Sequence, residues 1–529
     1  MGGGIKLKYM RKTLMLTWFL LGCNILFAQT KAGSILNNWF NKSPIDDKVY
    51  GAEVYKAYDF LKGKKSKTVI VAVIDAGIDI NHEDLKENIW VNPNEIPDNG
   101  IDDDNNGYID DVNGWNFLGN AKGQNISFEN TETARIYKRF KDKEKSEIDQ
   151  ADRYAFKFFK KVKRSYNRKL KDAERTKEWI VRFKNRYKTA CSNICNEIGK
   201  DSVTIADLDS LRRANKSLKR DIKFMFMHGF DISYVKEFEE NIDIELTYHL
   251  NLDYNPRDII GDDVRNLKTS YGNNNIYGPE ASHGTFVAGI IAAKRDNNLG
   301  IDGVAENVKI MGLKAVPNGD ERDKDIAKAV RYAVDNGAQI INMSFGKSFS
   351  PYKYLVDEAF EYAEKKGILL VHAAGNESYN IDKVKQYPTK HISKTKSISS
   401  WITVGASGRN KNSRFVANYT NYGKENVDIF APGTSLRSLA PESKYSIGSG
   451  TSYAAPVVSG VAALLLSYYP QLTANQLKDI ILQSAVRYKD TKVTKPGTQK
   501  KQIQFEKLSK TGGLVNAYEA VKMADAMTK

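Results

Sequence analysis

The sequence predicts an α/β protein built on a doubly wound, mostly parallel sheet with a long helical insertion. Short, continuous runs of aliphatic and β-branched residues recur along the chain, and helical patterns that end at glycine lie between several of them. Strands that are buried on both faces of a parallel sheet have this composition. Alternation of such strands with helices and short loops predicts a doubly wound sheet. A long, charged, helix-prone stretch interrupts the alternation and predicts the insertion.

The N-terminal residues 1–29 are interpreted as an export signal. Basic residues among the first twelve positions precede a mostly apolar run over 13–28, which is short for a bilayer-spanning helix. A start at Met10 would leave a complete signal. Two processing alternatives remain open. We favour cleavage near Ala28, which releases a soluble secreted or periplasmic protein; alternatively, the segment ending at Cys23 resembles a bacterial lipobox and predicts a lipid-anchored envelope protein.

Residues 30–66 are interpreted as a short lead-in, and residues 67–126 as the first part of the core. The apolar run over 67–74 predicts a buried strand that ends at Asp75. In open α/β sheets, ligands bind beyond the carboxyl ends of the strands. Asp75 therefore lies where a functional residue is expected.

Residues 127–250 are predicted to form a basic helical insertion. Aromatic and aliphatic residues at spacings of three and four predict helices over 152–170 and 175–187, and no proline occurs between residue 127 and Pro256. Much of the formal net charge of +16 lies roughly in residues 134–222. A basic surface can attract nucleic acid, anionic lipid or acidic protein, but no nucleic-acid motif is present and we expect no nucleic acid. A solvated helical hairpin and a docking or gating element remain alternatives.

Residues 251–529 are predicted to complete the core. Further buried strands are expected at 308–316, 338–344, 368–374, 401–406 and 427–430. Helical patterns at 324–336 and 352–366 lie between strands, and an amphipathic helix over 514–527 ends the sequence. No segment after the export signal is predicted to span a membrane.

Three local signatures carry residues suited to nucleophilic catalysis. Asp75 ends a buried strand, His283 begins an apolar helix over 282–289, and Ser452 enters a second one in the Gly-Thr-Ser-Tyr-Ala-Ala-Pro run at 450–456. A serine hydroxyl needs a base to accept its proton. A histidine can be that base, and a buried carboxylate orients the imidazole and stabilises its charged form. The positive end of the second helix would also favour developing negative charge.

In this order, the three segments resemble those of the subtilase, or subtilisin-like, family of serine peptidases. The resemblance covers about residues 65–120 and 255–525, and the boxes around His283 and Ser452 are highly specific. It implies a secreted serine endopeptidase with Asp75, His283 and Ser452 as its triad, a polypeptide substrate and an acyl-enzyme intermediate. One departure is Tyr453, where the family usually has methionine. The short lead-in is another, because many relatives carry a folded inhibitory propeptide.

The resemblance also implies the remaining parts of the site. In relatives, the asparagine of an Ala-Ala-Gly-Asn box donates to the oxyanion, which assigns this role to Asn376, and the backbone N–H of Ser452 is the expected second donor. The family has an extended edge that pairs with the substrate backbone and forms a wall of the pocket for the side chain before the scissile bond. The expected substrate-binding residues are Ser344, Phe345, Gly346, Ala374 and Gly375.

The acidic loop at 98–113 predicts a structural calcium site, whereas no cofactor is expected for catalysis. Oxygen-bearing residues alternate along it around a glycine at the sixth position, as in an EF-hand-like loop. The expected ligands are Asp102, Asp104, Asn106, the Tyr108 carbonyl and Asp110. Asn113 stands where such a loop has a bidentate glutamate, a role that Asp111 or Asp98 would take. The alternative is a solvated acidic turn.

Two alternatives to a broad endopeptidase remain open. A catalytically inactive binding scaffold would place function in the insertion, although no triad member is missing. A processing protease of narrow specificity would keep the chemistry and use the insertion to select partners.

Cys191 and Cys195 lie one helical turn apart, which is too far for easy bridging, so we expect buried small apolar residues there.

Overall fold

The computed structural model describes residues 37–529, except residues 215–216, 229–231, 265 and 268. The predicted export signal and the first part of the lead-in lie outside the described residues. The chain divides into two compact units, Met1–Ser127 together with Pro256–Lys529, and Phe128–Asn255. They are called the core unit and the insertion unit below.

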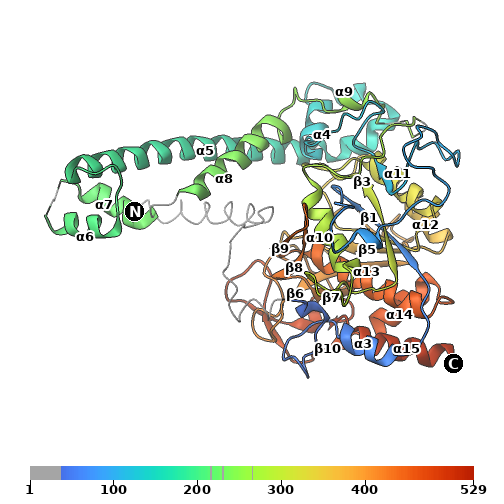
Figure 1. The fold of residues 1–529 in the computed structure, drawn as a ribbon. Helices are drawn as coiled ribbons and strands as arrows, with labels where there is room; N and C mark the ends of the chain where they lie inside the picture. The colour runs from blue at the N-terminus through green and yellow to red at the C-terminus, as the bar shows by residue number, and fades with distance from the viewer. Residues whose placement is uncertain (1–36, 215–216, 229–231, 265, 268) are drawn as a thin grey trace. The chain divides into compact units, whose positions relative to one another are not determined.

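A nine-stranded sheet lies at the centre of the core unit (Figure 1). Its strand order is β10-β13-β7-β6-β5-β4-β1-β3-β2, and every neighbouring pair is parallel except β10 with β13. The strands are β1 (Val69–Asp75), β2 (Gly114–Asn116), β3 (Val308–Lys314), β4 (Ile340–Met343), β5 (Leu369–Ala373), β6 (Trp401–Ser407), β7 (Ile429–Pro432), β10 (Val486–Arg487) and β13 (Gly513–Leu514). Two hairpins lie outside it, β8 (Leu436–Ala440) with β9 (Lys444–Gly448) and β11 (Lys492–Thr494) with β12 (Gln502–Gln504).

Helices cover both faces of this sheet. One face packs against α3 (Val54–Leu61), α10 (Ala281–Ala292), α13 (Thr451–Tyr468), α14 (Ala474–Gln483) and α15 (Ala517–Thr528), and the other against α11 (Asp323–Asp335) and α12 (Lys353–Lys365). Short helices η1 (Trp39–Asn41), η2 (Lys86–Asn88), α9 (Arg257–Ile260) and η6 (Phe505–Lys507) lie in connections. Strand β1 is apolar up to Asp75 because its side chains enter the cores on both faces of the sheet. Val71 and Val73 pack on the face with α10 and α13, whereas Ala72 and Ile74 pack on the face with α11 and α12.

The predicted fold class is confirmed, and each predicted strand is present with ends within two residues of the prediction. The strands that the sequence did not predict are β2, β10, β13 and the two hairpins. They have between two and five residues. Segments this short contain too few residues for a periodic pattern to emerge.

A close approach places the N-terminus of α10 at the carboxyl end of β1. A Cβ atom on Gly284 would lie 2.2 Å from the carbonyl oxygen of Gly77 and 3.1 Å from the Cβ of Asp75. Only glycine allows the two backbones to come this close. The residue before it, His283, is thereby held near the end of β1.

The insertion unit is helical. It contains α4 (Glu132–Phe140), η3 (Lys145–Glu147), η4 (Gln150–Asp152), α5 (Arg153–Ile198), α6 (Ile205–Ala214), α7 (Lys219–His228), α8 (Ser233–Ile244) and the π-helical segment η5 (Glu245–His249). The two helical patterns predicted at 152–170 and 175–187 form parts of the single helix α5, whose buried residues include Val162, Tyr166 and Phe183. The Tyr166 hydroxyl donates a hydrogen bond to the Leu250 carbonyl oxygen at 2.8 Å.

Two further predictions concern cysteines and membrane spans. Cys191 and Cys195 are free thiols as expected, although they are half-buried rather than fully buried. Among the described helices, α13 is long and apolar enough to cross a membrane by length and composition, but 78% of it is buried inside the protein. This burial is typical of a helix in the centre of a protein core.

Candidate active site

Asp75 and His283 are brought together although they are 208 residues apart. The carboxylate oxygen Oδ1 of Asp75 accepts hydrogen bonds from the backbone N–H of Ala76 at 2.8 Å and from Nδ1 of His283 at 2.7 Å. Asp75 is 2% exposed, and the His283 side chain is 34% exposed. A proton on Nδ1 leaves Nε2 available as a base. Burial lowers the pKa of His283, but the charge and hydrogen bond of Asp75 outweigh it, so the pKa is raised above its ordinary value.

Ser452 is the second residue of α13, at the positive end of this helix. Its hydroxyl donates a hydrogen bond to the carbonyl oxygen of Ser344 at 3.0 Å. Within the described residues, no hydrogen bond joins Ser452 to His283. The next residue, Tyr453, nevertheless has its ring centroid 5.5 Å from that of His283, which places the two helix starts side by side. Catalytic hydrogen bonds of this kind often form fully only with substrate bound.

Asn376 is oriented by the first residue of α13. Its Oδ1 accepts hydrogen bonds from the backbone N–H and the hydroxyl of Thr451, both at 2.9 Å. The Thr451 hydroxyl also accepts the backbone N–H of Gly375 at 3.1 Å. Because Oδ1 of Asn376 faces Thr451, the NH₂ group on the other side of the amide faces away from Thr451.

The two predicted oxyanion donors converge beside Gly450. A Cβ atom on this glycine would lie 3.6 Å from the backbone nitrogen of Ser452 and 3.8 Å from Nδ2 of Asn376. The backbone N–H of Ser452 belongs to the first turn of α13, where such groups have no acceptor within the helix. Both groups are therefore able to donate to one developing negative charge next to the serine hydroxyl.

The predicted substrate edge follows β4 directly. The Ser344 hydroxyl donates to the Ser452 carbonyl oxygen at 2.8 Å, which attaches this edge to α13. The carbonyl oxygen of Phe345 lies 3.0 Å from Nε2 of His372. Burial lowers the pKa of His372 to about 4, so a neutral imidazole donates this hydrogen bond at physiological pH. Gly346 is exposed.

Ala374 and Gly375 lie on the segment that leads from β5 to Asn376. Their backbone groups bond within the protein: the Ala374 carbonyl accepts from Nδ2 of Asn421 at 2.9 Å, and the Gly375 carbonyl accepts from the Asn421 backbone N–H at 2.8 Å. Gly375 has a φ of +99°, which favours glycine. Asn421 is fully buried and holds this segment in place. It was missed by sequence reasoning because an isolated asparagine carries no local pattern.

Tyr453, the departure from the family pattern, fills the space beside the histidine. Its ring lies 4.1 Å from that of Phe286 between centroids. A Cβ atom on Gly448 would come within 2.4 Å of the tyrosine ring, so the hairpin strand β9 needs glycine at this point. Burial, followed by the charge of Asp75, raises the pKa of Tyr453, and its hydroxyl stays protonated at ordinary pH.

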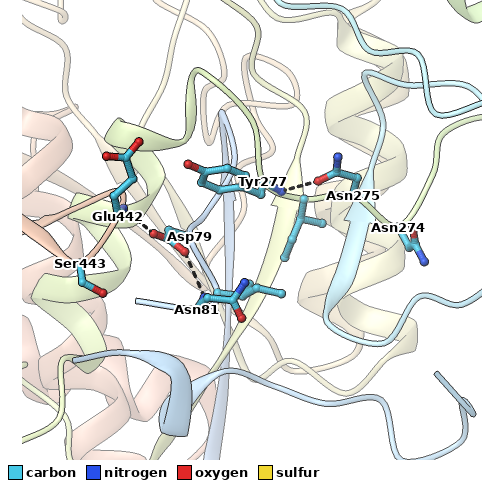
Figure 2. Close-up of a pocket in the computed structure, with 9 residues that line it drawn as sticks. Asp79, Asn81, Asn274, Asn275, Tyr277, Glu442 and Ser443 are labelled. Atoms are coloured by element: carbon cyan, nitrogen blue, oxygen red, sulfur yellow. Dashed lines mark hydrogen bonds between the residues drawn. The ribbon is translucent and has the colours of Figure 1, made fainter. Parts of the chain in front are cut away.

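A hollow of about 460 Å³ adjoins this region (Figure 2). It is lined by Asp79, Ile80, Asn81, Asn274, Asn275, Ile276, Tyr277, Glu442 and Ser443. The backbone N–H of Asp79 donates to the hydroxyl of Thr285, two residues beyond His283, at 2.8 Å. The Asp79 carboxylate accepts the backbone N–H of Glu442 at 2.8 Å, which joins the loop after β1 to the β8–β9 turn. A wall of the hollow is therefore bonded to α10, the helix that carries the histidine.

The predicted calcium ligands are not all gathered at one point. The Asp110 carboxylate accepts the backbone N–H groups of Asn99 and Gly100, and the Asp102 carboxylate accepts those of Asn106 and Gly107. Asp104 instead lies in a group with Glu95 and Asp111, whose carboxylate oxygens are within 4.8 Å of one another. Glu95 precedes the loop, and sequence reasoning missed it.

The fold and the arrangement of these side chains define a class of protein. A buried carboxylate at a strand end, an imidazole bonded to it and a serine at a neighbouring helix start are typical of hydrolases that use a serine nucleophile. The paired amide donors beside the serine fit acyl transfer.

Comparison with known proteins defines the class further. The profile of the subtilase family matches residues 66–508. Subtilisin DY of Bacillus licheniformis is 37% identical over 213 residues, which are 40% of this chain and 72% of that protein. The thermophilic serine proteinase of Bacillus sp. (strain AK1) is 34% identical over 241 residues, 45% of this chain and 52% of that protein. The cell wall-associated protease of Bacillus subtilis (strain 168) is 35% identical over 217 residues, 40% of this chain and 22% of that protein.

The chain therefore belongs to the subtilase family and is a serine endopeptidase of that class. The matched segments span about half or less of the last two relatives.

Proposed function

We propose that this protein hydrolyses peptide bonds in extended polypeptides through Asp75, His283 and Ser452. The observation that carries the proposal is the hydrogen bond between Asp75 and His283 next to the helix start that bears Ser452. A bonded carboxylate and imidazole near a serine provide the base that the hydroxyl needs. Family membership supports the same chemistry.

The reaction proceeds by acyl transfer. The Ser452 hydroxyl leaves its bond to the Ser344 carbonyl, transfers its proton to Nε2 of His283 and attacks the scissile carbonyl carbon. The resulting oxyanion accepts hydrogen bonds from the backbone N–H of Ser452 and from Nδ2 of Asn376. His283 then protonates the leaving amine, and water hydrolyses the acyl-enzyme by the same steps. Asp75 stabilises the positive charge that His283 carries in each half-reaction.

The substrate is proposed to lie along Ser344, Phe345 and Gly346, with Ala374 and Gly375 on its other side. The bonds of Ser344 to Ser452 hold this edge next to the nucleophile. Backbone pairing with an extended chain gives affinity with little dependence on sequence.

We also propose that the protein acts outside the cytoplasm, as a secreted or periplasmic enzyme. The pattern of residues 1–29 supports export. A relative named for its association with the cell wall supports it too. Acylation at Cys23 is the alternative that would leave the enzyme on the envelope.

Labelling with a fluorophosphonate probe tests the proposal. The purified protein is compared with Ser452→Ala and with the matched control Ser282→Ala, an exposed serine beside His283, and casein hydrolysis is measured in parallel. We expect labelling and hydrolysis in the parent and the control and neither in Ser452→Ala. Absence of both from folded parent protein would contradict the proposal and favour an inactive binding scaffold. Labelling that survives in Ser452→Ala would refute the assigned nucleophile.

A further inference from the structure

Three carboxylates gather beside the sheet edge without a basic partner. Glu95, Asp104 and Asp111 each offer an oxygen atom, and these atoms lie within 4.8 Å of one another. None of the three forms an ion pair with any residue that the structure describes. Glu95 and Asp111 are buried, with 7% and 0% exposure, so water cannot fully offset their mutual repulsion.

One oxygen in this group is buried and has no hydrogen-bond partner. Oε1 of Glu95 accepts the backbone N–H groups of Asp103 and Asp104, at 3.0 and 3.3 Å. Oε2 is buried and has no donor among the described residues. A buried acceptor without a partner is costly, and such atoms in folded proteins usually mark an ion or a water.

Neutral donors hold the other two carboxylates in place. Nδ2 of Asn92 donates to Asp104 at 3.1 Å and to Asp111 at 2.9 Å. Nδ2 of Asn106 bridges the same two carboxylates, at 3.1 and 3.0 Å. The hydroxyl of Tyr332 donates to Asp111 from α11. These contacts orient the carboxylates but supply no positive charge.

We propose that Glu95, Asp104 and Asp111 bind a divalent cation, and that calcium is the cation they suit. All three ligands are carboxylates that offer oxygen atoms, the ligand type that calcium prefers. The proposed ligands therefore differ from those that the EF-hand-like sequence pattern predicted, which lie at alternate positions of the loop. Asp102 and Asp110 hold the turns of the loop through backbone N–H groups.

A cation at this point ties the acidic loop to the protein core. Asp111 bonds to Tyr332 on α11, and the backbone N–H of Asn92 bonds to the carbonyl oxygen of Val112, just ahead of β2. Without a cation, the three carboxylates repel one another at this junction. Cation binding therefore stabilises the folded state through the loop, the edge strand β2 and α11.

Terbium, which takes calcium sites and luminesces when nearby aromatic rings absorb light, tests this proposal. The Tyr332 hydroxyl bonds to Asp111, and the Tyr108 ring lies 4.9 Å from the Tyr332 ring between centroids, so antennae are present beside the site. The full chain with Ser452→Ala is titrated with terbium, and calcium is then added as competitor. This variant makes the readout independent of catalysis, so its result does not depend on the proposed protease function.

The variants discriminate between the two ligand sets. We expect saturable luminescence in the Ser452→Ala chain, its loss in Glu95→Gln and Asp111→Asn, and its retention in the controls Asp102→Asn and Asp110→Asn. Terbium bound elsewhere contributes equally to all variants and cancels in the difference. Calcium should also raise the melting temperature of the parent but not of Glu95→Gln.

Two results would overturn the proposal. Loss of the signal in Asp102→Asn and Asp110→Asn, with retention in Glu95→Gln, would assign the cation to the regular loop set. Equal luminescence in every variant would leave the three carboxylates as an acidic turn without a cation.

Discussion

At the scale of single residues, the proposed chemistry depends on the hydrogen bonds of the Asp75 carboxylate. One oxygen receives both the Ala76 backbone N–H and the His283 imidazole, whereas Oδ2 is buried without a hydrogen-bond partner among the described residues. The described hydrogen bonds of this carboxylate therefore all use Oδ1, the oxygen that faces His283. The carboxylate raises the pKa of His283 against the opposing effect of burial.

Replacement of Asp75 by asparagine tests this coupling. In the proposed mechanism only neutral His283 accepts the serine proton, so activity should fall as the pH falls through the histidine pKa. Because Asp75 raises that pKa, Asp75→Asn should move the acidic limb of the kcat/KM profile to lower pH. It should also lower kcat by about 10⁴-fold, through the wrong imidazole tautomer. A limb that moves to higher pH in the variant would contradict this account.

At the scale of elements, the close contact between α10 and β1 brings Asp75 and His283 together. Gly284 directly follows His283 and faces the carbonyl oxygen of Gly77. The sequence resemblance identifies the His-Gly-Thr box, and the structure supplies the reason for its glycine. Any side chain at this position would push the helix away from the strand that ends in Asp75.

The substitution Gly284→Ala should therefore cost both stability and activity. The added methyl group would meet a backbone atom at 2.2 Å, an overpacking that typically costs about 1–3 kcal/mol. Urea unfolding measures this change beside Ser282→Ala, an exposed neighbour on the same helix, for which a change within about 0.5 kcal/mol is expected. Equal stability of the two variants would show that the helix and strand do not need this contact.

At the scale of the whole molecule, every residue assigned to catalysis and substrate binding lies in the core unit. The chain segments on either side of the insertion unit are also fixed to the core unit itself. Asn318 donates its backbone N–H to the Ser127 carbonyl oxygen at 2.9 Å, and Arg257 pairs with the fully buried Asp325. A unit with its own apolar core and anchored ends is able to fold alone.

Deletion of residues 128–255, with a short glycine-serine linker between Ser127 and Pro256, tests this independence. We expect a protein that unfolds cooperatively and reacts with the fluorophosphonate probe at a rate within a few-fold of the parent. Circular dichroism and probe labelling measure the two properties separately. A folded but unreactive deletion variant would show that the insertion unit takes part in assembling the site.

Much of the fold and of the candidate site was predictable from sequence because the signals are local. The apolar run that becomes β1 ends at Asp75, and His283 and Ser452 each begin an apolar helix. Residue type, immediate neighbours and chain order suffice to identify such segments. The short strand β2 could not be found in this way because three residues show no periodicity.

The sequence by itself determined the α/β class, the family resemblance and the identity of the catalytic candidates. Only the tertiary structure decided that Asn421 braces the segment before Asn376, and that Glu95 joins Asp104 and Asp111. The physical reason is distance along the chain. Contacts between remote residues arise when strands and helices pack, and an isolated asparagine or glutamate carries no pattern that foretells its partner.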